Sequence, residues 1–203
     1  MEYIISVLLG YLLGSSSMAF YLGRMKNIDV REHGSGNLGA SNTAVTLGWG
    51  AAVLVAVHDI GKAILAVCLV RWIFPGVAYL GELAGVASVI GHMYPFYLGF
   101  RGGKGLASFI GMTVAVHFPV ALGATLLLVL VTVIFDYIAL GSLALAIAVP
   151  VALWVVTGDA MMFVVLLPAT AVMVIKHIEN IQRIMAGTEI GLRRTAKGKD
   201  RVK

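Results

Sequence analysis

The sequence predicts an all-α, polytopic membrane protein, built as a bundle of about seven membrane helices. Hydrophobic residues make up 60% of the chain and charged residues 12%, whereas soluble domains average roughly 45–50% and 25%. The mean hydropathy is +0.95, and the apolar residues gather in long runs separated by short polar stretches. The 203 residues suffice for one bundle. We therefore expect a single integral-membrane domain over 1–203, ending in a basic cytoplasmic tail over 190–203.

The apolar runs give seven candidate spans in chain order. They cover about 3–23, 47–72, 77–91, 106–118, 120–135, 137–157 and 160–175. The first run lacks a basic leader, so we interpret it as a retained span rather than a cleaved signal peptide. Several runs are shorter than the roughly 17–25 residues of a complete span. Five complete spans with two half-spans lining a protein cavity is therefore the alternative.

The positions of Lys and Arg predict the orientation in the membrane. If the spans alternate, 13 of the 15 cations fall on one face, in the polar segments around 24–31, 101–104 and 176–203. Because positively charged loops stay inside, we expect an outside N-terminus and a cytoplasmic C-terminus. The motifs described next then face the cytoplasm, from a multi-pass protein of the cell inner membrane.

A glycine-rich loop lies between the third and fourth runs, in the stretch 91–108, G-H-M-Y-P-F-Y-L-G-F-R-G-G-K-G-L-A-S. The absence of a Cβ at Gly102 and Gly103 predicts backbone N–H groups turned toward an anion. Lys104 follows, and a helix N-terminus near Leu106 adds its positive end. The loop is not a Walker A motif. The sequence alone also allows a flexible basic loop between helices.

A second polar stretch, 33–42, reads H-G-S-G-N-L-G-A-S-N. Its small residues allow close backbone approach to an anion or hydroxyl group, Ser35 offers a hydroxyl, and Asn37 and Asn42 offer amides. The alternative is a turn that caps a helix starting near Asn42, with Ser41 or Asn42 as the N-cap.

A third stretch, K-H-I-E-N-I-Q-R over 176–183, follows the last span. His177 and Asn180 are three residues apart and share a helix face; a histidine here can bind phosphate or accept a proton. The alternative is an amphipathic tail with snorkelling cations. Ser142, at the start of the sixth span, reads as a small helix-contact residue or as a hydroxyl reaching the same site.

Other polar residues within the apolar runs receive structural interpretations. Asp59 and Lys62 share a helix face and are expected to form an ion pair that braces the bundle, although intramembrane charges are also candidates for a functional site. Glu82 is interpreted as an interfacial or packing residue. The single cysteine, Cys68, excludes a disulfide framework. No spacing of His, Asp or Glu predicts a metal site.

The three stretches together resemble the cytoplasmic motifs of the bacterial acyl-phosphate:glycerol-3-phosphate acyltransferases. The resemblance rests on G-S-G-N-L-G-A-S-N, on the stretch 91–108 and on K-H-I-E-N-I-Q-R-I-M-A-G-T-E, in that order and over essentially the whole chain. It implies a seven-helix membrane enzyme of phospholipid synthesis that moves a fatty acyl group from acyl phosphate to the 1-hydroxyl of glycerol 3-phosphate, without metal, cofactor or acyl-CoA.

The resemblance also implies the site residues. The catalytic candidates are Ser35, Lys104, His177 and Asn180; the substrate- and phosphate-binding candidates are Gly36, Asn37, Asn42, His92, Gly102, Gly103 and Ser142. The expected partners are the two substrates, membrane lipid and a soluble enzyme that makes acyl phosphate; no nucleic acid is expected. The chain departs from the family at Val45, where an arginine is usual. A transporter for a phosphorylated solute, or a non-catalytic relative, is the alternative.

The resemblance leads to a hypothesis of direct attack without an acyl-enzyme. Lys104 with Gly102 and Gly103 would hold the acyl-phosphate group and activate phosphate as the leaving group. The second phosphate would be held by Ser35, Ser142, His177 and Asn180. The base is either His177, expected to be a ligand first and a base second, or the substrate's own phosphate, whose second pKa of about 6 suits the task.

Overall fold

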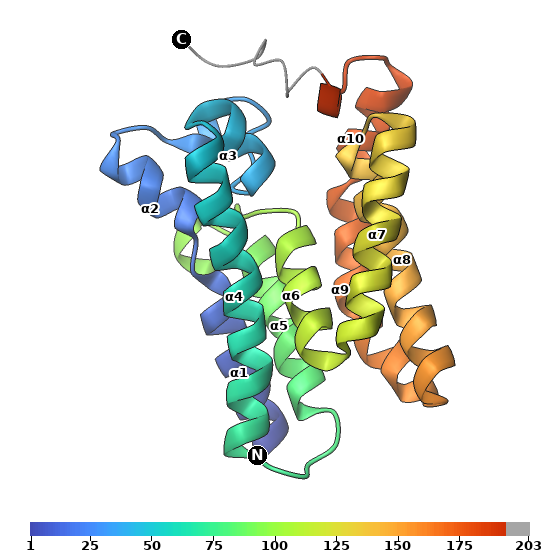
Figure 1. Ribbon diagram of the computed structural model, residues 1–203. Coiled ribbons are helices and arrows are strands. Elements are labelled where there is room, and N and C mark those ends of the chain that lie inside the picture. Colours follow the sequence, from blue (N-terminus) through green and yellow to red (C-terminus); the bar gives the residue numbers. More distant parts are fainter. Residues whose placement is uncertain (194–203) are drawn as a thin grey trace.

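A computed structural model describes residues 1–193, and every regular element in that part of the chain is a helix. In chain order, the elements are α1 (Glu2–Ser15), α2 (Met18–Met25), η1 (Val30–Glu32), α3 (Ala40–Thr46), α4 (Trp49–Ile73), α5 (Leu80–Met93), η2 (Phe96–Leu98), α6 (Leu106–Val116), α7 (Phe118–Phe135), α8 (Ile138–Thr157), α9 (Ala160–Lys176) and α10 (Ile178–Met185). The long helices run side by side as one bundle (Figure 1). The predicted all-α class is confirmed. Most of the basic tail, residues 194–203, lies outside the described residues.

Five stretches of the described chain are long and apolar enough to cross a membrane: Glu2–Met25, Trp49–Ile73, Phe118–Phe135, Ile138–Thr157 and Ala160–Met185. Two more helices correspond to the third and fourth predicted runs but are shorter. α5 has 14 residues and α6 has 11. Five long stretches and two short helices therefore account for the seven predicted runs.

The first predicted span, 3–23, lies within the candidate span Glu2–Met25, but that stretch is not one continuous helix. α1 ends at Ser15, and the Ser17 side chain accepts a hydrogen bond from the Phe20 N–H to start α2. A serine hydroxyl is a good N-cap because it satisfies a backbone donor that lacks a partner within the helix. The chain therefore turns at Ser16, and α2 leads away from the bundle axis (Figure 1).

α1 packs against α5 with their backbones in direct contact. A Cβ at Gly10 would overlap the backbone of Ala84, and one at Gly14 would overlap the backbone of Ser88. Small residues at i and i+4 on both helices permit this approach, which is the usual means of helix association in membranes. The contact fixes α5 and the loop that follows it.

The short helices α5 and α6 lie at the centre of the bundle. α5 contacts α1, α4, α6 and α9, and α6 also contacts α7. The core between them is apolar: Val89, Met93, Phe109, Met112 and Met173 are all fully buried. Close packing of this kind holds the ends of α5, α6 and α9 in a fixed relation.

All three polar motifs lie at the same end of the bundle (Figure 1). We call this the motif end; it comprises α2, α3, the loop 94–105 and α10. The N-terminus and the loop 74–79 lie at the opposite end, where Arg71 donates to Glu82 at 2.6 Å and to the Ala115 carbonyl at 2.8 Å. The gathering of the motifs follows from antiparallel helices that return each connecting loop to one side.

Candidate active site

The glycine loop is held by the end of α5. The Gly102 N–H donates to the Met93 carbonyl at 3.2 Å, and the Gly103 N–H donates to the His92 carbonyl at 3.0 Å. The expectation that these two N–H groups face an anion is therefore wrong. Their donors close the loop onto α5, because the last carbonyls of a helix lack partners within it.

The donors left open are those that begin α6. Gly105, with φ of 93°, turns the chain into the helix without a side-chain cap. Within residues 1–193, the backbone N–H groups of 106–108 donate to no acceptor, and the buried Ser108 hydroxyl has no partner either. A helix N-terminus with free N–H groups favours an anion. The free backbone donors therefore belong to the helix N-terminus predicted near Leu106 and not to the two glycines.

Lys104 extends from this loop across to α10. Its ammonium donates to Asn180 Oδ1. The pKa of Lys104 lies below the usual lysine value, chiefly because the side chain is desolvated and also because Arg183 is close. Two of the predicted site residues are therefore in direct contact, from motifs 76 residues apart in the chain.

Glu189 holds Asn180 in place, and sequence reasoning did not single it out. The Asn180 amide donates to Glu189 Oε1 at 2.6 Å, and the Arg183 guanidinium donates to Glu189 Oε2 at 2.6 Å. The Glu189 side chain is only 12% exposed. With both amide hydrogen-bonding groups engaged, Asn180 has one orientation, with its oxygen toward Lys104. Glu189 follows Asn180 by nine residues and a turn separates them, so helical spacing in the sequence could not pair the two.

His177 lies at the junction of α9 and α10 and is buried. Its Nδ1 is 2.7 Å from the Met173 carbonyl. A carbonyl oxygen can only accept, so Nδ1 carries a proton, and Nε2 has the free lone pair in the neutral ring. Met173 also packs against Gly105, which places His177 on the element that backs the glycine loop.

The first polar stretch folds around Asn42. The Asn42 Oδ1 accepts from the Ser35 N–H at 2.8 Å, and its amide donates to the carbonyls of Val30, His33 and Asn37 at 3.0, 3.1 and 2.9 Å. Asn42 is buried, so its polar atoms organise the loop rather than face a ligand. The predicted N-cap role is wrong too, because Gly39 caps α3.

The loop leaves other groups open. Ser35 is exposed and its hydroxyl makes no described hydrogen bond. Gly36, with φ of 69°, turns the chain toward Asn37, whose Oδ1 is buried without a partner among the described residues. Val45, half-buried on α3, supplies no charge. No described hydrogen bond joins this loop to Lys104; Arg31 joins it to the second motif by donating to the Leu98 carbonyl at 3.3 Å.

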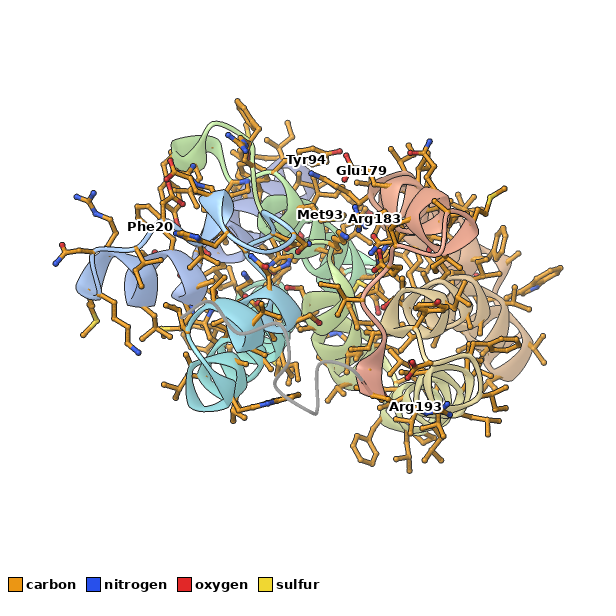
Figure 2. The ribbon with its side chains drawn as sticks, turned by 90° about the horizontal axis from the view of Figure 1, so that it is seen from above. Phe20, Met93, Tyr94, Glu179, Arg183 and Arg193 are labelled. Carbon is orange, nitrogen blue, oxygen red and sulfur yellow. The ribbon has the colours of Figure 1, made fainter. Side chains whose placement is uncertain are left out.

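Ser142 and His92 differ in their surroundings. The buried Ser142 hydroxyl donates to the Ile138 carbonyl in its own helix at 2.8 Å, so its proton is engaged. His92 lies against Gly103, where a Cβ would overlap its ring. The Tyr94 ring stacks with the Lys176 ammonium, 4.1 Å from the ring centroid. In the view of Figure 2, Tyr94, the residue after α5, projects near Glu179 of α10, in keeping with its contact to Lys176.

Comparison with known proteins agrees with these motifs. A sequence model of the glycerol-3-phosphate acyltransferase family matches residues 4–187. The chain belongs to this family. It is 40% identical to a glycerol-3-phosphate acyltransferase of Parasynechococcus marenigrum, over 89% of this chain and 85% of that protein. It is 39% identical to one of Shouchella clausii, over 92% and 94%.

Solved structures show the same fold. The chain superimposes with a TM-score of 0.88 and 32% identity on PlsY (YgiH), described as an integral membrane glycerol 3-phosphate acyltransferase in its glycerol 3-phosphate form. That match covers 95% of this chain and 96% of the other. A lysophosphatidic acid form of PlsY matches with a TM-score of 0.85 and 31% identity. The predicted family and the multi-pass membrane architecture are therefore confirmed.

Proposed function

We propose that this protein transfers a fatty acyl group from acyl phosphate to the 1-hydroxyl of glycerol 3-phosphate, giving lysophosphatidic acid and phosphate. Acyl transfer to glycerol 3-phosphate is the activity of the family to which the chain belongs. The observation that carries the proposal is the convergence of Lys104, Asn180 and the open N-terminus of α6. Both substrates carry phosphate, and this convergence offers an anion the Lys104 ammonium, the Asn180 amide hydrogen not bonded to Glu189, and backbone donors.

The donor's phosphate is bound by Lys104 and the first turn of α6. Positive charge at this position stabilises the negative charge that develops on phosphate as it leaves the acyl carbonyl. Gly102 and Gly103 contribute by shaping the loop. The acyl chain lies between helices and enters from the bilayer, which the apolar surface of the bundle allows.

The acceptor is bound by the remaining open groups of the motif end. Ser35, Asn37 and the Asn180 amide hydrogen that is not bonded to Glu189 are the candidates to contact glycerol 3-phosphate. Asn42 positions the first two by binding the Ser35 N–H and the Asn37 carbonyl. Ser142 bonds within its own helix. Val45 brings no positive charge, so the acceptor phosphate depends on these neutral donors and on Lys104.

The hydroxyl attacks directly, and His177 accepts its proton. The new bond joins the glycerol oxygen to the acyl carbonyl carbon, the bond from that carbon to the phosphate oxygen breaks, and phosphate leaves with the bonding electrons. The lone pair on His177 Nε2 suits a base more than a phosphate ligand, because a neutral ring cannot donate from that atom. The Ser35 hydroxyl has no base bonded to it among the described residues, which argues against an acyl-serine.

The proposed setting is the inner membrane, with the motif end in the cytoplasm, the N-terminus outside, and the two short helices within the bilayer. The concentration of Lys and Arg in the segments of the motif end supports this orientation. Acyl phosphate then comes from a soluble enzyme on the same side.

The test is an assay of the purified protein in lipid with glycerol 3-phosphate and either palmitoyl phosphate or palmitoyl-CoA. We expect lysophosphatidic acid and phosphate in equal amounts from palmitoyl phosphate, and no product from palmitoyl-CoA. Product from palmitoyl-CoA alone overturns the donor assignment. No product from either, with a folded protein, favours a transporter or a non-catalytic relative, and an acyl-serine trapped in a single turnover overturns direct attack.

A further inference from the structure

A buried polar cluster lies directly behind the glycine loop and has no part in the mechanism above. It joins Asp59 and Lys62 of α4 to His92 of α5 and to Ser16 at the break between α1 and α2. Asp59, Lys62 and His92 are each less than a tenth exposed. We infer that Asp59 and Lys62 are positioning residues, which hold His92 as a neutral ring with its Nε2–H presented to the bound donor phosphate beside Lys104. The inference rests on the proposed function.

Lys62 is fully occupied by three acceptors. Its ammonium lies 2.7 Å from the Ser16 carbonyl, 2.7 Å from Asp59 Oδ1 and 3.0 Å from His92 Nδ1. An ammonium has three donors and no acceptor. The three distances therefore account for all of its hydrogens, and the break after α1 is part of the arrangement because it leaves the Ser16 carbonyl free of helix bonding.

The protonation of His92 follows from this bond. Because Lys62 can only donate, His92 Nδ1 must accept, so that atom carries no proton. The ring proton is then on Nε2. Asp59 Oδ1 lies 3.4 Å from the same Nδ1 and is the acceptor that would draw the proton to Nδ1 if Lys62 were absent.

The opposite edge of the His92 ring faces the loop. A Cβ at Gly103 would overlap Nε2 and its neighbouring ring carbons, so the ring lies against the residue before Lys104. Among the described residues, His92 Nε2 has no hydrogen-bond partner. The His92 Nε2–H is thus a neutral donor without an acceptor among the described residues, and it lies against the residue that precedes Lys104. Such a donor suits an oxygen of a bound phosphate.

A structural brace is the alternative interpretation, and the chain contains a matched example of one. Arg71 and Glu82 join the same two helices at the opposite end by a 2.6 Å ion pair, with Glu82 buried. Breaking either pair leaves an uncompensated buried charge. If the Lys62 cluster is only a brace, breaking either pair should change activity to a similar extent. If it positions His92, only the loss of the Lys62 contacts should change donor binding.

The first measurement is the ¹⁵N spectrum of the wild-type protein in lipid with labelled histidine, with the His92 signals assigned by comparison with His92→Gln. We expect an unprotonated Nδ1 and a protonated Nε2, and the reverse in Lys62→Met. A proton on Nδ1 in the wild type overturns the inference, whether or not any variant folds.

The second measurement is steady-state kinetics with palmitoyl phosphate. For Lys62→Met we expect a fall in kcat/KM of about 10- to 100-fold, carried mainly by KM for the donor, and a change below about threefold for Arg71→Met. In a His92→Gln background, Lys62→Met should add less than about threefold, because residues that act as a unit are not additive. Full additivity, or equal losses in Lys62→Met and Arg71→Met, identifies a brace. If the wild-type protein shows no turnover of acyl phosphate, the proposed function is wrong. The ¹⁵N spectrum still decides, independently of turnover, which nitrogen of His92 carries the proton.

Discussion

Gly103 determines the geometry of the loop that carries Lys104. From the sequence we expected position 103 to be glycine because its N–H would face an anion. The structure shows a different reason. The N–H closes onto the His92 carbonyl, and the His92 ring occupies the space of a Cβ. The glycine-rich pattern indicated that this position needs a glycine. It could not indicate why, because the reason is the position of the His92 side chain, which belongs to another segment.

Gly103→Ala should therefore impair the enzyme by displacing the loop. The added methyl group overlaps His92, and a displacement of about 1 Å in such a site costs up to ~100-fold in rate. Gly61→Ala on α4 is the control, since a Cβ there meets nothing within 4 Å. Acyl-transfer rates and Tm of both variants test this; equal rates would show that the contact has no role in the loop geometry.

The charge of Lys104 predicts the alkaline limb of the pH profile. Burial and the nearby Arg183 lower the pKa of Lys104, so its ammonium is lost at a lower pH than in an ordinary lysine, whose pKa is about 10.4. Donor binding needs the charged form, and kcat/KM should therefore fall as pH rises through this lowered pKa. In Lys104→Arg, which stays charged, the residual activity should lose that limb. If the alkaline fall in kcat/KM is unchanged in Lys104→Arg, it reports the titration of another group.

At the scale of elements, the helix boundaries that escaped prediction depend on distant partners. The serines at 15–17 read as part of one apolar span, yet the chain turns there, with the Ser16 carbonyl bound by Lys62 from 46 residues later in the chain. The helix α10 was expected from the spacing of His177 and Asn180, whereas a role for Glu189 beyond it was not. Its role depends on a turn at Gly187 that returns the chain toward α10.

Glu189→Ala should destabilise the junction between α10 and the glycine loop. It removes the partner of the Asn180 amide and of Arg183, and such losses cost about 1–3 kcal/mol. Glu179→Ala is the control on the same helix, because Glu179 is 79% exposed and lies 3.8 Å from Arg183. Thermal unfolding in lipid should show a clear fall in Tm for the first variant only. Similar values for both would mean that Glu189 does not hold Asn180.

The whole molecule was the most predictable scale. Hydropathy is a local property, so it gave the all-helical class and the seven runs in order. Alternation of spans then gathered the three motifs at one end (Figure 1). The contacts within the site, such as Lys104 with Asn180, could be expected only through the resemblance of the motifs to a family, since they join segments 76 residues apart.

The proposed orientation can be tested by labelling single cysteines in a Cys68→Ser background. Ala186→Cys lies just after α10 and Ala78→Cys in the loop 74–79; both positions are exposed. An impermeant maleimide added to intact cells or spheroplasts should label position 78 and spare position 186 until the membrane is opened. The opposite pattern would invert the orientation and place the site outside.

The most direct test of the central claim compares Lys104→Met with Arg101→Met in the palmitoyl phosphate assay. Both substitutions remove one cation from the same loop, but Arg101 is exposed and Lys104 contacts Asn180. Loss of a group that stabilises developing charge costs about 10²–10³-fold in rate. We predict such a loss for Lys104→Met, and a change of less than about threefold for Arg101→Met. Near-normal turnover by a folded Lys104→Met protein would contradict the account.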